Sequence, residues 1–107
     1  MHWTEHYDET NGLTWEIPEI ALDGLDSLEG IDRNRSTEVW TAVLSAIYNA
    51  VHLDCAEVPV FAVAGSDSVV TLQRADFAEK IERAIEYFLE VEEYEACQCL
   101  QDLKKFI

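Results

Sequence analysis

The apolar residues in the last third of the chain recur at helical spacing, and this pattern constrains the fold more than any other feature. Five of them follow at steps of 4, 3, 4 and 3, namely Phe77, Ile81, Ala84, Phe88 and Val91. A second run repeats 4, 3 and 4, at Ala96, Leu100, Leu103 and Ile107. Each run lies on one side of a helix. Because the pattern slips between the two runs, we predict a C-terminal antiparallel helical hairpin over residues 74–106. A single bent helix is the alternative, since no glycine or proline marks the break.

A further amphipathic helix is expected over residues 36–53. Apolar side chains recur there at steps of one and three, at Val39, Trp40, Val43, Leu44, Ile47, Tyr48 and Val51. Ser36 is a residue type that begins helices, and the acid at Glu38 suits the positive end of the helix dipole. Residues 58–73 fit two interpretations. A short β-hairpin turning at Gly65–Ser68 suits their β-branched residues, and a short buried helix ending at Gly65 fits as well.

Residues 1–35 contain most of the chain-breaking residues. Three glycines and Pro18 leave no room for a long helix. Apolar and polar side chains alternate over residues 13–17, which suits a short strand. We expect an irregular acidic N-terminal arm, packed on the rest through its aromatic residues. The sequence therefore predicts a mainly α fold, with α+β as the alternative, in a single domain spanning residues 1–107.

Residues 22–33 carry an unusual repeat of three. Four apolar residues, at positions 22, 25, 28 and 31, are each followed by an acid, namely Asp23, Asp26, Glu29 and Asp32. A period of three fits neither an α-helix nor a strand, but it fits a short 3₁₀ turn or an extended threefold winding. Either geometry would turn the apolar residues toward the core, so we expect a row of exposed acids here.

The chain is strongly acidic, with 22 Asp and Glu against 7 Lys and Arg and a net charge of −15. Nucleic acid and anionic membranes attract basic surfaces, so we expect neither as a direct partner. A basic protein surface is the expected partner, and divalent cations bound by the carboxylates are an alternative. No signal segment or membrane-spanning run is visible, and cysteine is odd in number, which favours a reduced, cytoplasmic setting.

A second set of acids lies opposite the apolar seam of the predicted 76–93 helix. Its members follow at steps of 3, 3, 4, 4 and 3, at Asp76, Glu79, Glu82, Glu86, Glu90 and Glu93. Like charges at these spacings destabilise a helix by a few tenths of a kcal/mol per pair, so local stability does not explain them. A partner with Lys and Arg side chains does. Exposed aromatic residues, Trp3 or Trp15, would anchor the centre of such an interface.

Catalytic and metal-binding patterns are weak. Cys97 and Cys99 would point to opposite sides of a helix, and no second cysteine pair accompanies them, so we expect no metal site. No glycine-rich phosphate loop is present, and we expect no cofactor. His52 and Cys55 lie close in sequence and could form an activated nucleophile. Their place at the end of an amphipathic helix favours a capping role, so we expect no enzyme activity.

The tail of the chain resembles the UVR-type helical hairpin of nucleotide-excision-repair and related proteins. The residues that carry the resemblance are Tyr94, Glu95, Cys97, Leu100 and Asp102. The chain departs from that pattern by having glutamine at position 98, where the family has a small residue, and at position 101, where it has arginine. In that family the hairpin is a protein–protein docking element, and the resemblance implies such a role here.

In size, charge and acidic stripe the chain is similar to small acidic inhibitors of phages and mobile elements, the anti-CRISPR and anti-restriction proteins, and to acidic immunity proteins. The likeness implies a non-enzymatic inhibitor, in the host cell cytoplasm, that mimics DNA and occupies the basic surface of a nucleic-acid-acting or RNA-guided effector. The ten acids of the two rows would be its partner-binding residues. The alternative is a structural or adaptor protein that docks, or self-associates as a homodimer, through its C-terminal helices.

Overall fold

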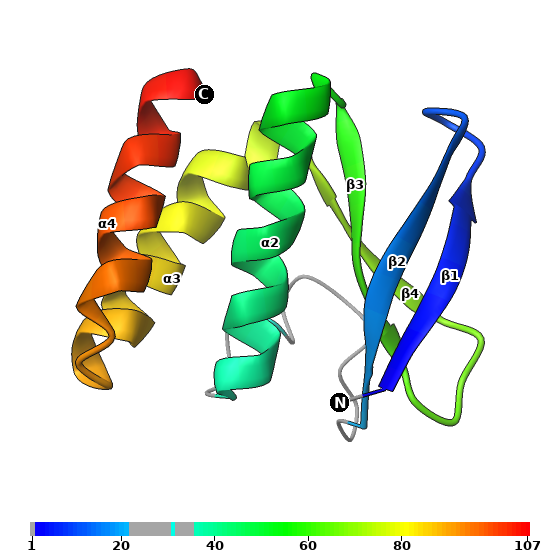
Figure 1. The fold of residues 1–107 in the computed structure, drawn as a ribbon, viewed down its shortest axis with the longest axis horizontal. Coiled ribbons are helices and arrows are strands. Elements are labelled where there is room, and N and C mark those ends of the chain that lie inside the picture. Colours follow the sequence, from blue (N-terminus) through cyan, green and yellow to red (C-terminus); the bar gives the residue numbers. More distant parts are fainter. Residues whose placement is uncertain (1, 22–30, 32–35) are drawn as a thin grey trace.

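The computed structural model describes residues 2–21, 31 and 36–107, which form a mixed α/β fold (Figure 1). Four strands form one sheet in the order β1-β2-β3-β4, namely β1 (His2–Asp8), β2 (Leu13–Ile20), β3 (Glu57–Val63) and β4 (Val69–Gln73). Neighbouring strands are antiparallel except β2 and β3, which are parallel. The helices are α2 (Thr37–Leu53), α3 (Phe77–Glu90) and α4 (Tyr94–Leu103), with 3₁₀ turns at Arg74–Asp76 and Lys104–Phe106.

The prediction of a mainly α fold with an irregular N-terminal arm is wrong, because residues 2–20 pair as the β1–β2 hairpin. Buried Trp15 and Ile17 alternate with exposed Thr14 and Glu16, as in a half-buried strand. Gly12 closes the turn with φ of 67°, a conformation that glycine adopts at little cost. β1 is an edge strand of the sheet and buries little of its length, so its sequence needs no apolar alternation.

Residues 58–73 adopt the hairpin of the two predicted alternatives, as β3 and β4. The turn includes Gly65, whose φ is 80°. Every residue of β3 after Glu57 is buried, which explains its continuous apolar sequence. The register with β4 shifts between Pro59 and Phe61, so this strand pair contains an irregularity.

Helix α2 is the central layer of the molecule. Ser36 caps its start, since the Ser36 side chain accepts a hydrogen bond from the backbone N–H of Glu38 at 3.2 Å. Asp54 ends it in the left-handed conformation, with φ of 54°. In Figure 1, α2 lies between the sheet on one side and α3 and α4 on the other. Its apolar stripe joins the core, which also includes fully buried Ile31.

The C-terminal helices pack on each other and on α2. Tyr87 connects α3 to α2, because its hydroxyl is hydrogen-bonded to Thr37 Oγ1 at 2.5 Å and its ring stacks on that of Trp40. The chain leaves α3 through Glu92, which has φ of 60°, and then runs back as α4. Leu100 and Leu103 of α4 are buried in the core.

The parallel contact between β2 and β3 is short. Only two residue pairs form it, Glu19 with Ala62 and Ile20 with Val63. Figure 1 shows the strands meeting near their C-terminal ends and diverging toward their N-terminal ends. Pro18 lies immediately before the paired segment of β2, and Pro59 lies in the diverging part of β3. Neither proline has an N–H, so neither can donate a hydrogen bond that would extend the ladder between β2 and β3.

Candidate functional site

The structure places the six acids predicted on one helix in three settings. Four are exposed on the helix itself, and we call them the α3 acidic row: Glu79, Glu82, Glu86 and Glu90. Asp76 precedes the helix in the 3₁₀ turn and is half-buried. Glu93 lies beyond the end of α3, at the N-cap of α4, and is exposed. The acids of the other predicted row, Asp23, Asp26, Glu29 and Asp32, lie outside the described residues.

Glu82 and Glu86 of the α3 acidic row form ion pairs with basic side chains. Lys104 Nζ contacts the Glu82 carboxylate, and Arg83 Nη1 lies 3.6 Å from Glu86 Oε2. These side chains are substantially exposed, so each pair stabilises the fold by at most about 1 kcal/mol. Lys80, from the same helix, is buried. The row is therefore acidic but partly compensated, and the contact from Lys104 could not be seen from the spacing of the acids in the sequence.

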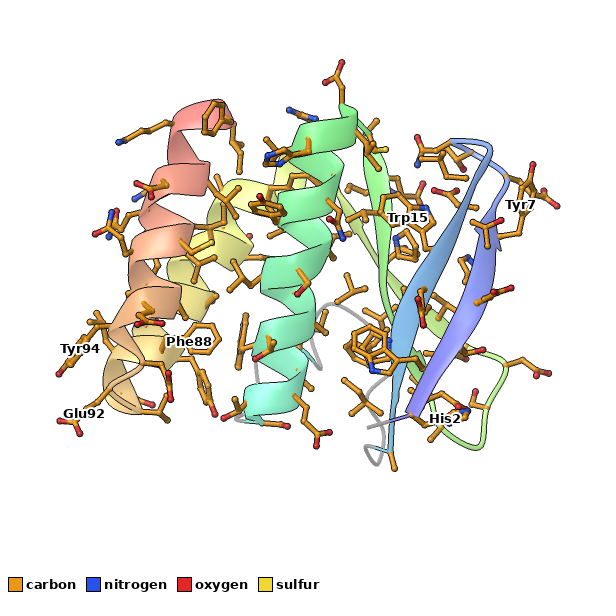
Figure 2. All side chains as sticks on the ribbon, in the orientation of Figure 1. His2, Tyr7, Trp15, Phe88, Glu92 and Tyr94 are labelled. Carbon is orange, nitrogen blue, oxygen red and sulfur yellow. The ribbon has the colours of Figure 1, made fainter. Side chains whose placement is uncertain are left out.

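A pocket of about 300 Å³ lies between the β1–β2 hairpin and α2, and we call it the hairpin–α2 pocket. Buried side chains form its floor, including Trp15, Ile17, Ala46, Pro59 and Val60. Exposed side chains form its rim, including Trp3, Glu16, Glu38, Thr41, Ser45 and Asn49. Figure 2 shows Trp15 on the side of β2 that faces the helices. Of the two predicted aromatic anchors, Trp3 is half-exposed and available to a partner, whereas Trp15 is part of the core.

Asp8 holds the floor of this pocket in place. Its carboxylate is 7% exposed and accepts hydrogen bonds from the Thr10 N–H (3.0 Å), the Asn11 amide (2.5 Å) and the Trp15 indole (3.3 Å). The Asn11 amide also donates to the backbone carbonyl of Glu57 at 2.8 Å. The buried acid is therefore a structural group, and it ties the hairpin turn to the first residue of β3.

The structure does not bring the candidate nucleophile and base into contact. The His52 ring is exposed, with its Nδ1 atom 2.9 Å from the Tyr48 carbonyl oxygen. The thiol of Cys55 is buried and points to the carbonyl of Leu53. Burial raises the pKa of the Cys55 thiol, nearby carboxylates including that of Asp8 raise it further, and a guanidinium group opposes them. An activated thiol needs the opposite shift.

We expect a disulfide reagent such as dithionitrobenzoate at pH 8 to label one of the three thiols quickly. Cys99 is half-exposed, whereas Cys55 and Cys97 are buried and should react only after unfolding. The absorbance of released thionitrobenzoate measures the number of thiols in each phase. Cys99→Ser should abolish the fast phase and leave the slow one. Fast labelling of Cys55 in that variant would contradict the assignment and restore the nucleophile hypothesis.

Within the part of the chain that the structure describes, no group of three or more His, Cys, Asp or Glu residues could hold a metal ion. Among the same residues, no helix combines the length and apolar character needed to cross a membrane. Cys97 and Cys99 do not share a site, because Cys97 packs toward the Ile85 carbonyl of α3 and Cys99 faces the surface.

Comparison with protein-family models, curated proteins and solved structures gives no match to this chain. The resemblances drawn from the sequence therefore remain predictions.

Proposed function

We propose that this protein is a non-enzymatic acidic inhibitor that occupies the basic surface of a nucleic-acid-acting or RNA-guided effector and so excludes its nucleic acid. The observation that carries the proposal is the α3 acidic row, four exposed carboxylates on one helix of a chain with net charge −15. The chemistry of such a row suits Lys and Arg side chains that otherwise contact phosphates.

The geometry of a helix supports a phosphate-like arrangement of these charges. Residues three or four positions apart on a helix have Cβ atoms about 5–6 Å apart, which is the scale of the phosphate repeat in a nucleic acid strand. Complementary charge would speed association with a basic partner and make binding sensitive to salt. In such a complex Glu82 and Glu86 would exchange their present partners, Lys104 and Arg83, for cations of the target.

The proposal is tested by neutralising the row. We expect the immobilised protein to capture nucleic-acid-binding proteins from a bacterial lysate at low salt, and to release them at ~0.5 M salt or when double-stranded DNA is added. The triple variant Glu79→Gln, Glu82→Gln, Glu86→Gln should bind the captured protein at least about tenfold more weakly, a loss of 1.4 kcal/mol. Calorimetry with the purified target measures this difference.

A matched control separates the position of the charges from their number. The triple variant Glu9→Gln, Glu92→Gln, Glu95→Gln removes three other exposed charges and should bind as the parent does. Equal weakening by both variants would show a nonspecific charge effect and refute the α3 acidic row as the binding surface. Binding that DNA does not displace would refute the mimicry.

The adaptor alternative also has an observation in its favour. Leu89, Val91 and Tyr94 are exposed around the turn between α3 and α4, where Figure 2 shows Tyr94 pointing out of the molecule and Phe88 pointing inward. Exposed apolar side chains grouped in this way suit a second copy of the chain or a partner helix. Docking through them would be insensitive to salt, so the same salt titration distinguishes the two functions.

A further inference from the structure

The opening of the hairpin–α2 pocket is a consequence of the backbone. The pocket is lined by both prolines of the chain, Pro18 and Pro59, at the place where β2 and β3 are no longer paired. Neither residue can donate a ladder hydrogen bond, so two donors are missing from the place where β2 and β3 diverge. The Asp8 network holds Trp15 in the floor, so the concave shape is preorganised.

The acids beside the pocket are arranged unfavourably for the isolated protein. The register of the hairpin places Glu5 directly opposite Glu16, and both are exposed. Like charges at directly opposed positions destabilise a strand pair. Exposed aromatic residues occupy the flanking positions of β1 on the same face, Trp3 and Tyr7. Glu38 adds a third carboxylate from the other side of the pocket.

No basic side chain of the described residues forms an ion pair with these three carboxylates. The basic residues seen in ion pairs contact other acids: Arg74 contacts Asp54, Arg83 contacts Glu86, Lys104 contacts Glu82, Lys105 contacts Asp102 and His2 contacts Glu19. A cation from outside this part of the chain would therefore relieve the repulsion between Glu5 and Glu16 and meet an indole face at the same place.

We propose that the hairpin–α2 pocket takes an arginine side chain of a basic partner protein. The guanidinium group would stack on the indole of Trp3, and the carboxylates of Glu16 and Glu38 would accept its N–H donors. The apolar stem of the arginine would lie on the pocket floor. An arginine suits the site better than a lysine, because a planar guanidinium can stack and form two-pronged hydrogen bonds at once. This proposal rests on the proposed function only in assuming a basic partner.

The test uses peptides whose arginines can be neutralised without a change of shape. A nine-residue glycine–serine peptide with three arginines is titrated into ¹⁵N-labelled protein, and the three tryptophan indole signals are followed by NMR. Trp3→Phe assigns the Trp3 signal. We expect saturable movement of the Trp3 signal, little movement of buried Trp40, and no movement with the citrulline peptide. A lysine peptide should bind about threefold more weakly.

Two double variants of equal net charge locate the site. Glu16→Gln, Glu38→Gln should weaken binding about tenfold, and Glu92→Gln, Glu95→Gln should leave it unchanged. The inference is overturned if the arginine peptide leaves the Trp3 signal in place, if citrulline serves as well, or if the pocket variant binds normally. If neutralising the α3 acidic row abolishes peptide binding while the pocket variant does not, the inference fails and the proposed function stands. If the peptide binds at the pocket but the protein captures no basic protein, the inference stands and the proposed function fails.

Discussion

Replacing Trp15 with alanine is expected to lower the free energy of unfolding by about 3–5 kcal/mol. The Trp15 side chain is 7% exposed and lies where β2 diverges from β3. Its removal would leave a cavity continuous with the hairpin–α2 pocket and would take one hydrogen-bond donor from buried Asp8. Because that cavity would open to solvent, partial filling by water places the loss toward the lower end of the range. Urea unfolding followed by far-ultraviolet circular dichroism measures it.

Two further substitutions divide this effect into its parts. Trp3→Ala removes an indole that is half-exposed, and should cost less than about 1 kcal/mol. Trp15→Phe retains an aromatic ring but cannot donate to Asp8, and should cost about 1–2 kcal/mol. A loss for Trp15→Ala no larger than that for Trp3→Ala would show that the hairpin does not pack on the core as described. It would also remove the floor of the proposed arginine pocket.

Local signals predicted the helices better than the sheet. The helix expected over residues 36–53 is present as α2, because its stripe, its Ser36 cap and its length all act within one segment. β1 carries no comparable signal, since an exposed edge strand is defined by its pairing with β2 and not by its own pattern. No glycine or proline marks the end of α3, so a single bent helix remained the alternative to two helices. Glu92, and not a glycine, takes the left-handed conformation there.

In the candidate site too, features within one segment could be predicted from the sequence, and contacts between segments could not. The α3 acidic row could be recognised from spacing, because its four members lie on one continuous helix. The ion pair between Glu82 and Lys104 could not, since that contact joins α3 to the 3₁₀ turn after α4. The hairpin–α2 pocket combines residues from β1, β2, α2 and β3, and only the strand register places Glu5 opposite Glu16. Trp3, Glu5 and Tyr7 occupy every second position of residues 3–7. This spacing was the one local sign in the sequence that the three side chains share a face of the hairpin.

Replacing Leu100 with alanine is expected to lower the free energy of unfolding by about 3 kcal/mol, with a fall in melting temperature of about 12–20 °C. The Leu100 side chain has no exposed surface and lies in the core, where α4 packs on α3. The apolar seam of the C-terminal helices is therefore used within the fold. Differential scanning calorimetry at protein concentrations tenfold apart measures the change and shows whether self-association contributes.

The same substitution bears on the choice between the two proposed functions. Leu89→Ala removes an equally large side chain that is 51% exposed, and should cost less than about 1 kcal/mol. If Leu100→Ala were as mild as Leu89→Ala, α4 would not be held on α3 in solution, and its seam would be open to a partner. That result would favour the adaptor alternative. A large loss for Leu100→Ala alone shows that the seam is used within the fold, so that among the described residues a partner would meet the α3 acidic row, the hairpin–α2 pocket or the exposed turn at Val91.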